Sequence, residues 1–358
     1  MGGVSDYAAI NSRVRIMYSG LLTPQVASSL RDTDDLPALI AILKNTVYGP
    51  SLKDVEDKEL TPKQALHKIK DRIVEVYMTI IHSAPVNARP VVLQLYRHFE
   101  INNLKAVLRG ITTHSTWEEI QGILFPLGSL GVLPAQQMLE SGSIEAAIAL
   151  LAGTPYYETL THALKRYSSE QSLFPLEVAL DLAYWHKLWS SASQISGVDR
   201  MQAMRVIGPL IDMTNLMWAI RYRVYYHLSE EEIINYTLPM GYHVHDEDIR
   251  SIAAGGDIAR IVDRIYPGMG NVEELLQDPA HGLPKLELKI QQRIREQLKS
   301  VFVGNPFNIG VALALAALNE LELQDLTVLI EAKSAHMPVE KFAPYLLMGT
   351  GSEDSISS

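Results

Sequence analysis

Two groups of side chains in this sequence have types and spacings that could support chemistry. His243, His245 and Asp246 offer the imidazole and carboxylate ligands of a zinc site, but the imidazoles point the same way only in an extended segment. The sequence predicts a turn before a helix here, where an aspartate serves as an N-cap. Glu177 and Asp181 are four residues apart, so both carboxylates share one helix face, as in an acid–base pair. In a chain with 41 acidic residues, such a mid-helix pair is more typical of solvated or arginine-paired carboxylates.

Other patterns for catalysis are missing from the sequence. It has no glycine-rich phosphate loop, no Gly-x-Ser-x-Gly elbow and no His-Glu-x-x-His motif. It has no cysteine, which excludes a disulfide scaffold, a thiolate metal site and a cysteine nucleophile. We therefore expect no catalytic residue, no metal and no cofactor. A helical metalloenzyme using His243, His245 and Asp246 is the last of our alternatives.

The charge balance bears on the kind of partner. The chain of 358 residues has 31 Lys and Arg against 41 Asp and Glu, and this net charge of −10 argues against a nucleic-acid partner. The charge is uneven: the balance is +3 over residues 1–110, −6 over 111–239 and −7 over 240–358. Such an asymmetry can orient a protein between two partners. The alternative is that these charges only lie scattered over solvent-exposed faces.

The elements that carry these residues are predicted to be helices. Apolar residues recur at i, i+3 and i+4, as in Leu66, Ile69, Ile73 and Val76, and no sustained two-residue alternation occurs. We therefore predict an all-α protein. Two charge-free stretches, 120–139 and 300–319, are interrupted by Gly and Pro, and the second leaves a helix of only about 13 residues, short of the roughly 20 of a membrane span.

Internal repeats are the most informative feature of the sequence. One pattern, Asn-Leu followed by Arg six residues after the Asn, occurs twice, and a weaker third copy has Asp in place of Asn and Glu331 in place of Arg. The Asn or Asp positions are 112 and 110 residues apart. We interpret the motif as structural, with the Asn early in a helix and the Arg reaching a neighbouring carboxylate or carbonyl. The motif residues are Asn103, Leu104, Arg109, Asn215, Leu216, Arg221, Asp325 and Leu326.

Other markers keep the same register. Capping boxes begin at Thr116 and Ser229, and each of three short predicted helices follows an N-cap, namely Asp35, Ser143 and Asp257. These helices run towards Tyr48, Tyr156 and Tyr266, which lie 55, 59 and 59 residues before the motif Asn or Asp. We include these tyrosines, with Glu177 and Glu287, among the candidate structural or interface residues. The predicted copies are residues 1–114, 115–228 and 229–351, followed by a polar tail, 352–358.

The repeats resemble a known family. Residues 95–110, Leu-Tyr-Arg-His-Phe-Glu-Ile-Asn-Asn-Leu-Lys-Ala-Val-Leu-Arg-Gly, are similar to the signature of the C subunit of V/A-type rotary ATPases, which is related to the d subunit of vacuolar ATPases. Further matches are Tyr7 with Arg13 and Arg15, and the segments 46–48, 175–181, 329–333 and 337–340. The resemblance covers nearly the whole chain apart from 352–358. Glu331 departs from the arginine that this family usually has there.

The resemblance implies a funnel of three similar helical domains around a pseudo-threefold axis. A member of this family is a non-catalytic central-stalk protein, which sits on the cytoplasmic face of the membrane rotor ring and receives the foot of the central shaft. It transmits torque between ATP chemistry and transport of protons or sodium ions, and it meets the membrane only through the complex. A stand-alone all-α scaffold or adaptor is the alternative, although solenoid repeats usually have 20–50 residues rather than ~111.

Overall fold

The computed structural model describes residues 4–53 and 60–348, and this part of the chain folds into helices with no strand. The all-α prediction is therefore confirmed. The predicted polar tail, 352–358, lies outside the described residues. The long helices are α1 (Val4–Ser19), α5 (Pro62–Ser83), α6 (Arg89–Thr112), α11 (Phe174–Gln194), α12 (Gly197–Val224), α17 (Pro279–Ser300) and α18 (Ile309–Ser334).

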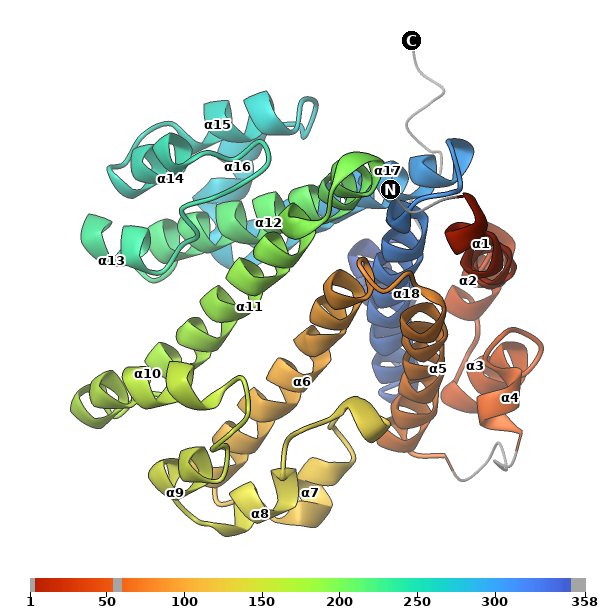
Figure 1. The fold of residues 1–358 in the computed structure, drawn as a ribbon, viewed down its shortest axis with the longest axis horizontal. Helices are drawn as coiled ribbons and strands as arrows, with labels where there is room; N and C mark the ends of the chain where they lie inside the picture. Colours follow the sequence, from red (N-terminus) through yellow and green to blue (C-terminus); the bar gives the residue numbers. More distant parts are fainter. Residues whose placement is uncertain (1–3, 54–59, 349–358) are drawn as a thin grey trace.

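Shorter helices fill the segments between the long ones. They are α2 (Pro24–Arg31), α3 (Leu36–Leu43), α4 (Gly49–Leu52), α7 (Trp117–Gln121), α8 (Ala135–Glu140), α9 (Ile144–Ala149), α10 (Tyr157–Glu170), α13 (Glu230–Asn235), α14 (Asp246–Ala253), α15 (Ile258–Ile265), α16 (Val272–Gln277) and α19 (Val339–Phe342). Three single turns are 3₁₀ helices: η1 (Gly128–Leu130), η2 (Val301–Val303) and η3 (Ala343–Tyr345). In Figure 1 the shorter helices lie around the long ones, with α2–α4, α7–α10 and α13–α16 on different sides.

The predicted caps begin the short helices. Thr116 and Ser229 each form a capping box, in which the hydroxyl accepts a backbone N–H and the glutamate three residues on accepts the N–H of the cap. Asp35, Ser143 and Asp257 accept backbone N–H groups at the starts of α3, α9 and α15. These caps satisfy donors that a helix start leaves free, so the short helices begin where the sequence predicts.

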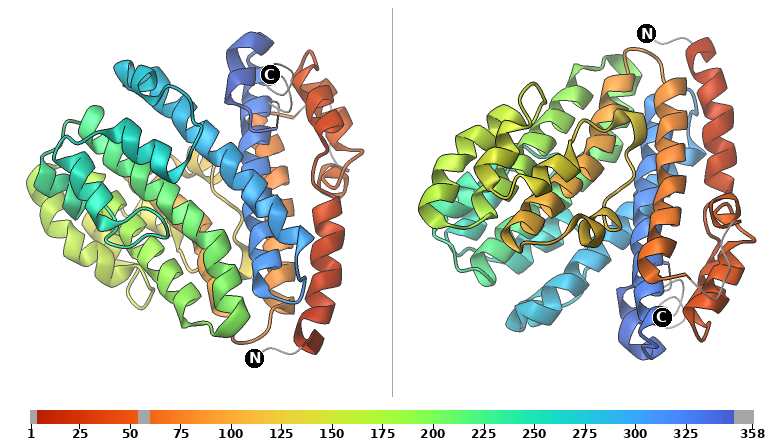
Figure 2. Two further views of the ribbon diagram at one scale, coloured as in Figure 1. Left: turned by 90° about the horizontal axis from the view of Figure 1, so that it is seen from above. Right: turned by 90° about the horizontal axis from the view of Figure 1, so that it is seen from below.

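Six of the long helices form a ring in which each helix contacts the next. α5 contacts α6, α6 contacts α11, α11 contacts α12, α12 contacts α17, α17 contacts α18, and α18 returns to α5. The turns α5–α6, α11–α12 and α17–α18 lie at one end of the molecule (Figure 2). α18, late in the chain, therefore packs beside the early helices α1 and α5.

α18 explains one of the charge-free stretches. Its first ten residues, 309–318, are all buried, since α1, α5, α12 and α17 surround the helix. A helix that is apolar all round is a buried helix, and here it is covered by protein. The other stretch, 120–139, is broken into α7, η1 and α8. Among the described helices, none has the length and apolar content needed to cross a membrane.

Candidate binding cavity and its supports

The two motif asparagines hold the segments that follow their helices. Asn103 donates its side-chain N–H to the backbone carbonyl of Phe125 (2.8 Å) and accepts the Phe125 N–H (2.7 Å). Asn215 makes the same pair of bonds with Leu238, at 2.8 and 2.7 Å. Both asparagines are buried in the middle of their helices, rather than early in them as the sequence suggested. They pair a segment distant in sequence because a mid-helix residue has no free backbone N–H groups beside it.

In the third motif an aspartate stands at the position of the asparagine and makes different hydrogen bonds. Asp325 accepts the N–H groups of Leu347 (2.7 Å) and Met348 (2.8 Å), since a carboxylate has no N–H to donate. Burial raises the pKa of Asp325 to about 6, against these two bonds, which lower it. The leucine that follows each Asn or Asp is completely buried in the core: Leu104, Leu216 and Leu326.

A buried acidic residue lies one turn before each motif Asn or Asp, and sequence reasoning missed it. Glu100 accepts hydrogen bonds from the Tyr156 hydroxyl (2.6 Å) and from Arg97. Glu322 accepts from the Tyr48 hydroxyl (2.7 Å), and burial raises the pKa of Glu322 to about 7. The sequence signal is an acid three residues before each Asn or Asp.

In the second repeat the buried acid accepts no hydrogen bond from a tyrosine hydroxyl among the described residues. Asp212 is one methylene shorter than glutamate, and its carboxylate accepts the N–H groups of Tyr242 (2.7 Å), His243 (2.7 Å) and Val244 (3.2 Å). Among the described residues, none hydrogen-bonds the hydroxyl of Tyr266, although that side chain is buried. Burial, with the nearby charge of Asp212, raises the pKa of Tyr266.

The motif arginines pair with carboxylates on the neighbouring long helix, as the sequence suggested. Arg109 on α6 binds Glu177 on α11 through two hydrogen bonds of 2.6 and 2.9 Å, and Arg221 on α12 binds Glu287 on α17. Asp181 pairs with Lys105, so Glu177 and Asp181 each have a basic partner. This arrangement is a pair of interhelical ion pairs rather than a general acid beside a general base.

The three residues of the zinc alternative have separate roles. His243 lies with Nδ1 3.5 Å from the buried Asp212 carboxylate, while Asp246 pairs with Arg250 (2.6 Å). His245 is the N-cap of α14 in place of the expected aspartate, and its backbone N–H donates to Asp248 at the third helical position. The described residues contain no group of three or more metal-binding side chains.

A central cavity of about 590 Å³ is bounded by all six packed long helices. Equivalent positions of the repeats contribute to its lining. Among them are the residues that directly precede the motif Asn or Asp in each repeat: Asn102, Thr214 and Gln324. Apolar side chains dominate the lining, and Trp185 and Met213 are among them. An apolar cavity with few polar groups is typical of a binding site.

Three exposed valines mark the end of the molecule where the long helices turn. Val86 lies in the α5–α6 turn, Val198 at the start of α12 and Val303 at the end of η2. Their exposed fractions are 79%, 54% and 89%. Exposed apolar residues that gather at one end of a molecule are typical of an interaction surface, and the three turns lie at the same end (Figure 2). We call this set the valine end.

Comparison with known proteins gives the family. A family model described as ATP synthase (C/AC39) subunit matches residues 10–345. The chain belongs to this family. The resemblance inferred from residues 95–110 and the other matches is thereby confirmed.

Relatives of this C/AC39 chain carry the same designation. It is 24% identical over 350 residues to the C subunit of the A-type ATP synthase of Methanocaldococcus jannaschii, covering 96% of this chain and 87% of that protein. It is 22% identical over 338 residues to the C subunit of the V-type ATP synthase of Deinococcus radiodurans, covering 94% and 90%. Both comparisons extend over nearly the whole chain.

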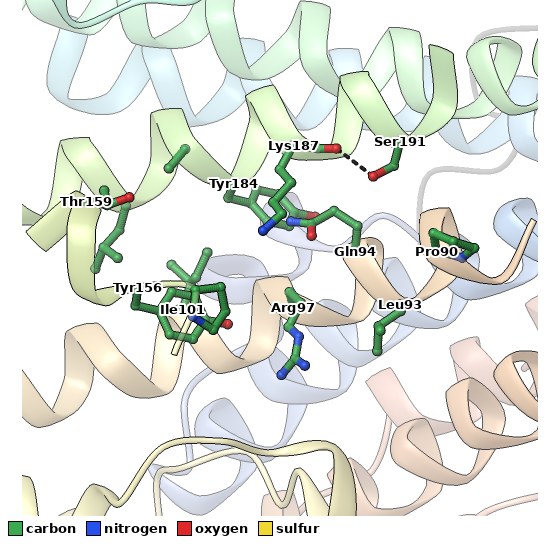
Figure 3. A pocket seen from close by; sticks show the side chains of 13 residues that line it. Pro90, Leu93, Gln94, Arg97, Ile101, Tyr156, Thr159, Tyr184, Lys187 and Ser191 are labelled. Carbon is green, nitrogen blue, oxygen red and sulfur yellow. Dashed lines mark hydrogen bonds between the residues drawn. The ribbon is translucent and has the colours of Figure 1, made fainter. Parts of the chain in front are cut away.

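A smaller hollow of about 280 Å³ in this C/AC39 chain lies beside the hydrogen bond between Tyr156 and the buried Glu100. It lies between α6 and α11, with Tyr156, Arg97, Tyr184 and Lys187 around it (Figure 3). Tyr156 and Arg97 both donate to the buried Glu100, so the start of α10 is tied to the middle of α6. A hydrogen bond to a buried charged group contributes more than a neutral one.

Removing one tyrosine hydroxyl tests this support. We expect Tyr156→Phe to lower the free energy of unfolding by about 1.5–3 kcal/mol, because Glu100 loses a hydrogen-bond donor in the interior. Tyr266→Phe is the matched control, and it should stay within about 0.5 kcal/mol or stabilise the chain, since its hydroxyl makes no bond among the described residues. Urea unfolding measures both. Equal losses in the two variants would contradict this account.

Proposed function

We propose that the chain is a non-catalytic central-stalk subunit of a V/A-type rotary ATPase. In this proposal it is a socket that couples the rotating central shaft to the membrane rotor ring, for transport of protons or sodium ions. The observation that carries the proposal is the central cavity bounded by six long helices, together with the valine end at the turns that join these helices. Membership of the ATP synthase (C/AC39) subunit family supports it.

The two surfaces suit two different partners. The cavity begins at Leu95, Leu210 and Ala317, six or more residues beyond the first residues of α6, α12 and α18. The valine end lies at the turns where those helices begin. We assign the cavity to the end of the shaft and the valine end to the exposed loops of the rotor ring. The chain would then lie on the cytoplasmic side, reaching the membrane only through the complex.

The same proposal includes three similar helical domains in a pseudo-threefold funnel, with copies at 1–114, 115–228 and 229–351. The repeated Asn and Asp bonds and the buried acids support this division. Each tyrosine bond joins neighbouring copies, since Tyr156 meets Glu100 and Tyr48 meets Glu322. Such links would stiffen a ring of helices, and a protein that transmits torque needs that stiffness.

Binding to two separately purified partners tests the proposal. The full chain is mixed with shaft subunits and with detergent-solubilised rotor ring, and complexes are separated by size-exclusion chromatography. We expect the chain to bind each partner and to bring the two into one complex. A chain that is folded by circular dichroism and binds neither partner would overturn the proposal.

A further inference from the structure

Glu320 places a carboxylate in the wall of the central cavity. It lies on α18, and its side chain keeps 25% of its area open where it lines the cavity. It accepts a hydrogen bond from the Tyr77 hydroxyl. Its Oε2 lies 4.0 Å from Nδ1 of His98, which is beyond hydrogen-bonding distance. Within the described part of the chain, no Lys or Arg pairs with this carboxylate.

The groups that face Glu320 leave its charge uncompensated. Burial, with the charge of Lys105, lowers the pKa of His98 to about 4, so the imidazole is neutral near pH 7. Burial and the Glu320 charge raise the pKa of Tyr77 and of Tyr184 on α11, so both phenols stay neutral. Lys105 on α6 and Asp181 on α11 form an ion pair, so their charges offset each other. The side chains that α12 and α17 contribute to the cavity are uncharged: Leu210, Met213, Thr214 and Gln291.

The cavity's basic residue is engaged elsewhere. Lys70 on α5 donates to the backbone carbonyl of Ile123 (2.8 Å) and lies 5.9 Å from the centre of the Phe125 ring. Glu320 is the acidic residue of the described cavity lining. An occupant that fills the cavity removes water from this carboxylate, and a carboxylate without water is costly to bury unless a cation with hydrogen-bond donors meets it.

We propose that Glu320 receives a lysine or arginine side chain from the protein segment that occupies the cavity. This rests on the proposed function, in which that segment is the end of the shaft. The apolar lining favours a segment with an apolar surface. The Glu320 carboxylate favours one basic residue on that segment, at the depth of Tyr77 and His98. Glu320 would then fix both the orientation and the depth of the inserted segment.

The proposal has a pH signature. Burial raises the pKa of Glu320 to about 7 in the free chain. A cationic partner favours the ionised carboxylate, so binding should tighten as the pH rises through 7 and weaken below it. Below pH 7 the carboxylate becomes progressively protonated, and we therefore expect binding at pH 6 to be several-fold weaker than at pH 8. The lowered pKa of His98 reduces the contribution of its imidazole in this range.

The experiment measures binding of the full chain to purified shaft subunits by isothermal titration calorimetry at pH 6 and pH 8 and at two salt concentrations. At pH 8 we expect Glu320→Gln to bind at least about tenfold more weakly than the wild type, with a smaller salt dependence. Its affinity should change little between pH 6 and pH 8. Glu296→Gln, which removes an exposed carboxylate outside the cavity, is the matched control and should bind like the wild type.

The outcomes separate this inference from the proposed function. If wild-type chain binds the shaft and Glu320→Gln binds equally well or more tightly at pH 8, the cationic contact is wrong while the socket remains. If the folded wild type does not bind the shaft, the proposed function itself fails. Circular dichroism melting of each variant confirms that binding is compared between folded chains.

Discussion

Replacing Val86, Val198 and Val303 together by aspartate is expected to weaken binding to the membrane rotor ring by more than about a hundredfold. The three side chains are largely exposed, so the free energy of unfolding should change by less than about 1 kcal/mol. Burying one valine contributes about 1.5 kcal/mol or more, and burying an aspartate without a partner is unfavourable. Three losses of this size exceed the roughly 2.8 kcal/mol that corresponds to a hundredfold change.

The measurement is co-sedimentation of the full chain with ring reconstituted in vesicles. Leu150→Asp is the control, since it introduces the same charge at an exposed apolar residue at the end of α9, away from the valine end. It should bind the ring like the wild type. The triple variant should still bind the shaft, because the valines do not line the cavity. Unchanged ring binding by the triple variant would remove the valine end from the account.

Asn215→Ala is expected to lower the free energy of unfolding by about 3 kcal/mol. Asn215 and Leu238 are both buried, and the substitution leaves the N–H and the carbonyl of Leu238 without partners. Each unsatisfied buried group costs about 1–3 kcal/mol. Asn235→Ala, at the exposed end of α13, is the control and should change the free energy by less than about 0.5 kcal/mol. Urea denaturation of both variants measures the difference.

The third repeat gives a sharper version of this test. Asp325→Asn restores the residue of the other two motifs, yet we expect it to destabilise the chain. Asp325 accepts two backbone N–H groups, and one of them would face the NH₂ of an asparagine. A stability equal to or above that of the wild type would show that the two carboxylate bonds do not hold this segment.

Local signals were sufficient to predict the all-α fold and the starts of several short helices. Thr116, Ser229 and Asp257 begin short helices because each supplies an acceptor for the first free N–H groups. The position of the motif was predicted, but its geometry was not. Asn103 lies in the middle of α6, since it serves the distant backbone of Phe125 rather than its own helix start. A partner 22 residues away cannot be read from helical spacing.

The site was predictable only in part, since its parts come from distant segments. Arg109 and Arg221 were expected to reach carboxylates, and the structure pairs them with Glu177 and Glu287. Glu320 has no sequence signal, because its role depends on α5, α6 and α11 meeting around the cavity. The valine end likewise requires three turns that are far apart in the chain to lie together (Figure 2).

Site-specific cross-linking in the assembled complex tests the central claim most directly. The chain has no cysteine, so Thr214→Cys in the cavity and Val198→Cys at the valine end each give a single attachment point for a short photo-cross-linker. Products are identified by mass spectrometry in a complex that contains ring and shaft. We predict that position 214 links to the shaft and position 198 to the rotor ring. Exchange of the two partners, or linkage of both positions to the same partner, would contradict the account.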